Sequence, residues 1–136
     1  MQIAILFVVT SVVFLIADAL MLRAVIQPLF QQHLGGQLID GLRVAPAALF
    51  YLTYMFGILW FAGLPALRND APVSALIQGA ILGFVAYGTY ELTSWSIMRQ
   101  WHGSMVAIDW TWGTLITGVA AWAGVMAARA WDAAPR

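Results

Sequence analysis

Long apolar runs separated by short polar intervals are the main pattern of this 136-residue chain. The first run extends from Ile3 to Leu22 and is interrupted only by Thr10, Ser11 and Asp18. About twenty mostly apolar residues form a helix long enough to cross the hydrocarbon core of a bilayer. The runs therefore predict four transmembrane helices, at residues of about 3–25, 45–67, 73–99 and 105–130.

The intervals between the runs predict how the helices connect. Residues 27–43 form the longest polar interval, and their apolar positions follow helical spacing in two short halves. This pattern is typical of an amphipathic segment that lies along the membrane interface. The two later intervals, near Asp70 and Arg99, are short turns. We therefore predict a single all-α domain over residues 1–136: an antiparallel four-helix bundle with an interfacial segment between its first two helices and both termini on one side.

Composition supports a membrane protein and excludes several other classes. The chain is 62% hydrophobic and 9% charged, far from the roughly 45–50% apolar and 25% charged residues of a soluble domain. Six arginines balance six acids and lysine is absent, so there is no basic face for nucleic acid. Cysteine is absent too, which removes disulfides, thiolate nucleophiles and Cys-ligated metals. The lipid bilayer is the partner that this composition predicts, and the sequence names no cofactor.

Three acids lie within the apolar runs and are the centre of any functional interpretation. A carboxylate in hydrocarbon costs roughly 2.5–3.5 kcal/mol on insertion scales, so Asp18, Glu91 and Asp109 should face protein or a wet cavity. In an antiparallel bundle, the distance along the chain from a connection converts to depth below one membrane face. By this measure the three acids and two tyrosines, Tyr51 and Tyr54, converge in the leaflet next to the first and third connections.

Helical spacing adds detail around the two later acids. Tyr87 lies one turn before Glu91, within reach of its carboxyl group, and Trp112 lies about one turn after Asp109. Stripes of small residues on the same helices suit close helix contact. These stripes are Ala75, Gly79 and Gly83 on the third helix and Ala120, Gly124 and Ala128 on the fourth.

We predict one polar pocket that solvent can reach and that opens toward the first and third connections. Two acids in one site cannot both ionise cheaply, so one of Glu91 and Asp109 should hold a proton near neutral pH. The candidate ligand-binding or proton-handling residues are Asp18, Tyr51, Tyr54, Tyr87, Glu91, Asp109 and Trp112.

Structural roles are the alternative for each feature. The acids can be neutral within the bundle or paired with arginine, and Asp18 is close enough in sequence to pair with Arg23. His33 and His102 fall on the same side of the membrane, but histidines in two separate connections form no metal-binding motif, so no metal site is predicted. Most tryptophans, Trp101 among them, fit interfacial anchors or the core.

Several of these residues belong to strings that resemble a known family. The strings are Asp18, Phe50-Tyr51-Leu52-x-Tyr54, Tyr87-Gly88-Thr89-Tyr90-Glu91-Leu92-Thr93, Trp101 and Asp109-x-x-Trp112-Gly113-Thr114. Over nearly the whole chain they resemble a family of small bacterial predicted membrane proteins of unknown function. Family members commonly have Tyr-Asp-Leu-Thr-Asn where this chain has Glu91 and Ser94. The resemblance implies a four-helix protein of the bacterial inner membrane and brings no activity with it.

Two function classes follow, and a third is weaker. The first is a small carrier or binding protein that handles a small ligand or protons in the pocket of acids and tyrosines. The second is a structural or accessory subunit, whose surface contacts a partner membrane protein or a second copy. The third is a membrane enzyme acting on lipid, with Glu91 and Asp109 as acid and base. No phosphate-binding loop, His-Glu-x-x-His string or serine elbow is present, which argues against a familiar enzyme.

Overall fold

The computed structural model describes residues 1–135, and helices make up most of this length. Two of the membrane-length helices contain a π-helical turn, in which hydrogen bonds reach back five residues rather than four. In chain order the elements are α1 Gln2–Met21, the π turn η1 Leu22–Ile26, α2 Gln27–Leu34, the 3₁₀ turn η2 Gly35–Gln37, α3 Val44–Ile58, the π turn η3 Leu59–Gly63, α4 Leu64–Arg68, α5 Pro72–Ile97 and α6 Gly103–Ala133. Residues 1–135 contain no strand, so the predicted all-α class is confirmed.

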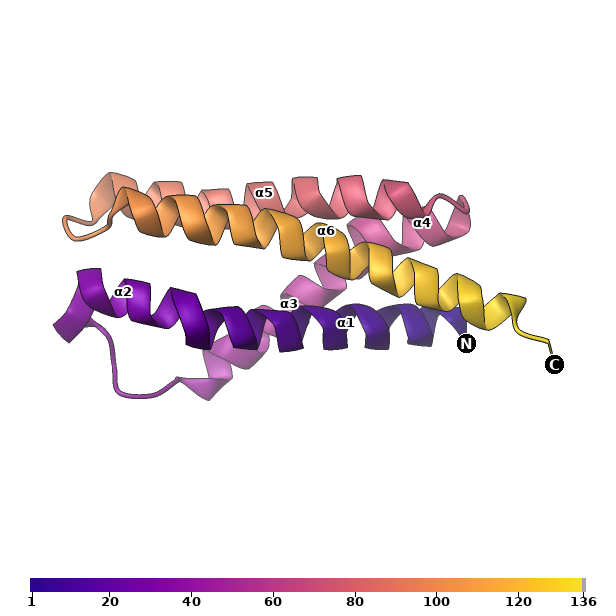
Figure 1. Ribbon diagram of the computed structural model, residues 1–136, viewed down its shortest axis with the longest axis horizontal. Helices are drawn as coiled ribbons and strands as arrows, with labels where there is room; N and C mark the ends of the chain where they lie inside the picture. The colour runs from indigo at the N-terminus through magenta and orange to yellow at the C-terminus, as the bar shows by residue number, and fades with distance from the viewer. Residues whose placement is uncertain (136) are drawn as a thin grey trace.

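Four continuous helical stretches are long and apolar enough to cross a membrane. They are Gln2–Gln37, Val44–Arg68, Pro72–Ile97 and Gly103–Ala133, with 36, 25, 26 and 31 residues. At about 1.5 Å per residue, each is longer than the roughly 30 Å hydrocarbon core of a bilayer. Both chain ends lie at the same end of the bundle (Figure 1). The predicted four-helix membrane architecture is therefore confirmed.

The connection between the first two spans differs in part from the prediction. Residues 27–34 do not turn along the membrane face, because α2 continues α1 in nearly the same direction (Figure 1). At the end of the π turn η1 the N–H of Gln27 donates to the carbonyl of Leu22, and Pro28, which has no N–H, follows without breaking the helix. The chain leaves the helix at Gly35, whose φ is 37°. Only residues 38–43 remain as a non-helical connection.

The interface between α5 and α6 is the most extensive in the bundle, and glycines in it allow the two backbones to approach closely. A Cβ atom on Gly79 would lie 2.8 Å from the carbonyl oxygen of Thr117, and one on Gly83 would overlap the carbonyl oxygen of Gly113. Ala75, Gly79 and Gly83 are all buried. The predicted small-residue stripe of the third span is therefore an internal packing surface.

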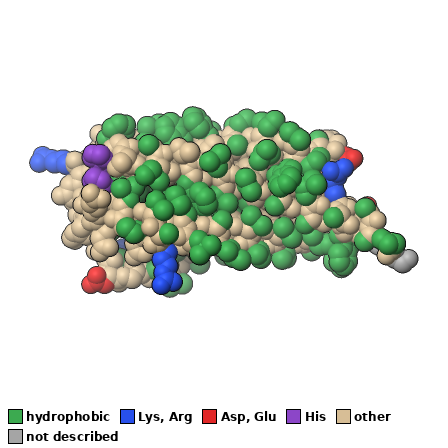
Figure 2. Space-filling model, viewed as in Figure 1, with side chains coloured by type: hydrophobic (Ala, Val, Ile, Leu, Met, Phe, Trp, Pro, Cys, Tyr) green, Lys and Arg blue, Asp and Glu red, His purple; other side chains and the backbone are tan. Residues whose placement is uncertain are grey.

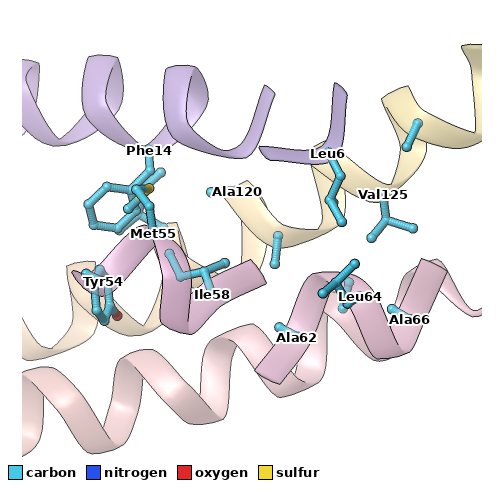
Figure 3. Close-up of a cluster of buried hydrophobic side chains, with 14 residues drawn as sticks. Leu6, Phe14, Tyr54, Met55, Ile58, Ala62, Leu64, Ala66, Ala120 and Val125 are labelled. Atoms are coloured by element: carbon cyan, nitrogen blue, oxygen red, sulfur yellow. The ribbon is translucent and has the colours of Figure 1, made fainter. Parts of the chain in front are cut away.

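On its other side α6 packs against α1, again through small residues. The predicted stripe of the fourth span is buried, and a Cβ atom on Gly124 would overlap the Thr10 hydroxyl group. α3 crosses the bundle diagonally (Figure 1). Large side chains such as Phe14 and Ile58 fill the space around this crossing (Figure 3).

The outer surface changes character along the bundle. Figure 2 shows hydrophobic side chains over the middle of the molecule and charged or histidine side chains toward its two ends. At the end that holds the termini, Arg129 Nε lies 2.6 Å from Asp70 Oδ1. An apolar middle between two polar ends matches the layering of a bilayer.

Candidate functional site

Three helices each contribute one acid to the interior. Asp18 on α1, Glu91 on α5 and Asp109 on α6 are buried, with 6%, 0% and 8% of their surface exposed. The three side chains thus face protein rather than lipid, as the cost of placing a carboxylate in hydrocarbon requires. The acids fall into two hydrogen-bonded groups, one around Asp18 and one around Glu91.

Asp18 is held by two neutral donors from other helices. Tyr51 on α3 donates its hydroxyl hydrogen to Asp18 Oδ2 at 2.7 Å, and Trp112 on α6 donates its indole N–H to Oδ1 at 3.1 Å. Each carboxylate oxygen therefore has one donor, and neither donor carries a positive charge. Hydrogen bonds of this kind stabilise an ionised carboxylate away from water.

Glu91 and Asp109 make up the second group, as a pair of neighbouring carboxyl groups. Trp101 Nε1 donates a hydrogen bond of 2.8 Å to Glu91 Oε2. Glu91 Oε1 is buried and receives no hydrogen bond from an N–H or hydroxyl group within residues 1–135. The Asp109 carboxyl group lies within hydrogen-bonding reach of Glu91. Because a carboxylate has no hydrogen to donate, a hydrogen bond between these two acids requires that they share one proton.

A cavity of about 730 Å³ lies beside Asp18 and Asp109. Its wall is formed by the first span from Asp18 to Phe30, by the connection that follows α2 and by the first half of α3. The middle of α5 and Asp109 on α6 complete the wall. Most of the described lining residues are apolar or aromatic, and none is Arg or His. Glu91 is outside the lining and is linked to the cavity through its contact with Asp109.

Tyr87 lines the cavity but is not hydrogen-bonded to Glu91. Its ring lies against Gly113 on α6, where a Cβ atom would overlap it, and the residue is part of the cavity wall. The hydrogen bond to Glu91 that their spacing allows is not formed in the described chain. Gly113 therefore positions Tyr87, a role that the sequence did not reveal.

Tyr54 points into the hydrophobic core instead of the cavity. Its hydroxyl group lies 2.7 Å from Thr117 Oγ1. The hydroxyl hydrogen of Thr117 is donated to the carbonyl of Gly113 at 2.6 Å, so Tyr54 is the donor in its own bond with Thr117. The ring of Tyr54 packs edge-on against Phe14, with centroids 5.4 Å apart. Tyr54 therefore belongs to the core and not to the wall of this cavity.

Trp101 is the site residue that sequence reasoning missed. It was expected as an interfacial anchor, yet only 7% of its surface is exposed and its indole N–H bonds Glu91. Its ring also packs edge-on against Phe30 of α2 at 5.3 Å. The available signal was its place among the strings that resemble the family.

His33 and His102 lie against each other at the end of the molecule nearest the cavity (Figure 2). Their rings are stacked with centroids 4.4 Å apart, and Ser104 Oγ lies 2.9 Å from His102 Nδ1 and 3.4 Å from His33 Nε2. These contacts join α2 to the start of α6. Within residues 1–135, no group of three or more acidic or histidine side chains is arranged to hold a metal ion.

Comparison with known proteins places the chain in one family. No curated protein and no solved structure matches it. A family model matches residues 3–126 and so reaches into all four membrane-length helices. The family description agrees with the apolar outer surface, and the helices of this membrane protein contact the lipid bilayer. The chain belongs to the family described as Predicted membrane protein (DUF2177).

Proposed function

We propose that this protein binds a small molecule in the cavity beside Asp18 and Asp109, and that the Glu91–Asp109 pair exchanges a proton as the ligand enters or leaves. The proposal is carried by one observation: a cavity of ligand size is bordered by two acids from different helices. A largely apolar wall with a few converging polar groups is the usual form of a small-molecule site. The role we assign is that of a carrier or binding protein in the inner membrane of a bacterium.

The surroundings of the acids support a functional use over a purely structural one. Polar groups that only lock a bundle are expected to be fully paired within the protein. Asp18 is paired through both oxygens, yet it borders open volume together with Asp109, so a bound molecule can reach both acids. An ionisable group in such a position within a membrane is a functional candidate by default.

An accessory subunit, joined to a partner membrane protein or to a second copy, is the alternative. Its polar groups would serve packing alone, and the cavity would be an unfilled space between helices. Small molecules would then show no binding that depends on the volume of the cavity.

Ala47 and Ala48 on α3 provide a matched pair of positions for the test. Ala47 lines the cavity, whereas Ala48 is exposed and outside the lining. Ala47→Trp should fill the cavity with an indole ring, and Ala48→Trp should place the same ring on the outer surface. Both variants add the same bulk to the same helix, so only the first removes cavity volume.

Binding is measured on protein in phosphatidylcholine nanodiscs with phenyl-substituted probes of different charge. The probes are the cation tetraphenylphosphonium, the neutral triphenylphosphine oxide and the anion tetraphenylborate. We expect saturable binding of at least one probe to the parent protein and to Ala48→Trp, and its loss in Ala47→Trp. Absence of saturable binding, or equal binding to both variants, would reject the proposal in favour of the accessory subunit.

A further inference from the structure

The cavity carries a second inference, which rests on the proposed function and names the class of its ligand. We infer that the ligand is an organic cation, with one ammonium-like positive charge on an apolar body. The charges around the cavity and its aromatic wall both favour this class.

The acids at the cavity have no positive partner within the protein. No ion pair to Asp18, Glu91 or Asp109 is formed within residues 1–135. Arg23, five residues after Asp18, is exposed and is not part of the cavity wall. Even when Glu91 and Asp109 share one proton, the three acids together retain a net negative charge. A cation is the ligand that such a site attracts, because the field of unpaired acids is weakly screened by a low-dielectric wall.

Glu91, the partner of Asp109, adds to the negative charge beside the cavity. Its side chain is fully buried, and Oε1 has no N–H or hydroxyl donor in the described part of the chain. Through Asp109, which borders the cavity, a bound ammonium group would stabilise the negative charge of the whole pair.

The wall of the cavity suits an apolar body rather than a hydrated ion. Phe30, Phe50 and Tyr90 contribute aromatic rings, and most of the other lining residues are aliphatic. Aromatic faces attract organic cations, and this interaction contributes about 2 kcal/mol or more when the cation is desolvated. A hydrated metal ion would need several oxygen or nitrogen ligands in one place, and residues 1–135 contain no group of three or more that could hold one.

Charge is tested with the same nanodisc samples and probes. We expect tetraphenylphosphonium to bind the parent protein about tenfold or more tightly than triphenylphosphine oxide, and tetraphenylborate not to compete with it. Asp18→Asn keeps the side-chain shape and removes one negative charge, so it should weaken phosphonium binding by about tenfold or more. Asp40→Asn is the matched control, because Asp40 is exposed, lies in the connection over the cavity and is not in its lining.

The outcomes separate this inference from the proposed function. If the neutral probe binds as tightly as the cation and Ala47→Trp abolishes both, the small-molecule site stands and the cation class is overturned. If no probe shows binding that depends on the cavity, both fall. Equal phosphonium affinity in Asp18→Asn and Asp40→Asn, each with parental helix content by circular dichroism, would also overturn the cation class.

Discussion

The Asp18 carboxylate accepts a hydrogen bond on each oxygen, from Tyr51 on one and from Trp112 on the other. Since neither donor is charged, each hydrogen bond replaces part of the hydration that the carboxylate loses on burial. This arrangement keeps a negative charge at the cavity without an arginine beside it. The side chain can therefore attract a cation from solution instead of being neutralised by its own chain.

Tyr51→Phe tests this solvation of Asp18. Removing the donor leaves one oxygen of a buried charge unsatisfied, so we expect the free energy of unfolding to fall by about 1.5–3 kcal/mol. Tyr90→Phe is the control, because Tyr90 is 50% exposed and its hydroxyl group makes no hydrogen bond in the described chain. Thermal unfolding in detergent, followed by circular dichroism, compares the two. Equal stability of the two variants would mean that Asp18 does not depend on Tyr51.

The Glu91–Asp109 pair leads to a prediction about protonation. Because the two acids can bond only by sharing a proton, the parent protein should show the carbonyl stretch of a protonated carboxyl group near neutral pH. Glu91→Gln and Asp109→Asn should each lose this infrared band while the fold survives. Asp40→Asn should keep the band. A parent spectrum without a protonated carboxyl band contradicts the shared proton.

Residue depth could be predicted from the sequence, whereas the direction of each side chain could not. Asp18, Glu91 and Asp109 come together because span lengths fix how far each lies below the same membrane face. Tyr51 and Tyr54 have similar depth, but three residues along a helix separate their directions by about 60°. Because of this difference, Tyr51 forms a hydrogen bond with Asp18, whereas Tyr54 forms one with Thr117.

At the scale of the helices, the sequence predicts contact faces better than helix ends. Repeated small residues mark the faces of α5 and α6 because only glycine and alanine permit such close approach. The length of the first helix was not predictable in the same way. Pro28 usually marks a helix start or break, and nothing in the local sequence signals that the π turn η1 would carry the helix past it to Leu34.

Gly83→Leu tests the contact between α5 and α6. A leucine side chain would meet the backbone of Gly113, so we expect a loss of stability of about 2 kcal/mol or more. Gly57→Leu is the matched control, because a Cβ atom on Gly57 has no neighbour within 4 Å. Both variants replace a helical glycine by leucine, and melting in detergent compares them. If Gly83→Leu melts like Gly57→Leu, the interface is looser than the structure indicates.

For the molecule as a whole, the cavity depends on how α3 crosses the bundle. Its second half reaches the core through Tyr54 and Ile58, while its first half lies along the cavity together with the connection that follows α2. The diagonal path of α3 (Figure 1) cannot be inferred from hydropathy, which sets span length and not crossing angle. The sequence therefore predicts a polar pocket at the acids, but it does not predict which part of α3 lines the pocket or how large the pocket is.

The absence of cysteine allows a test of whether the cavity is wet and negatively charged. Ala86 lines the cavity on α5, and its neighbour Val85 is 58% exposed on the outer surface. Thiol modification proceeds through the thiolate and therefore needs water. We expect Ala86→Cys to react with charged methanethiosulfonate reagents in nanodiscs, and Val85→Cys, facing lipid, to react slowly.

The modification rates of a cationic and an anionic reagent can then be compared to determine the sign of the electrostatic potential inside the cavity. If unpaired acids dominate, a trimethylammonium reagent should modify Ala86→Cys about tenfold or more faster than a sulfonate reagent of similar size, because a cleft of one charge sign concentrates ions of the opposite sign. Adding Asp18→Asn to Ala86→Cys should reduce this preference, while adding Asp40→Asn should not. Labelling is followed by mass spectrometry, and saturating tetraphenylphosphonium should protect the thiol. An Ala86→Cys protein that reacts no faster than Val85→Cys would mean that solvent does not reach the acids, and the proton exchange and the cation site would both lose their route to water.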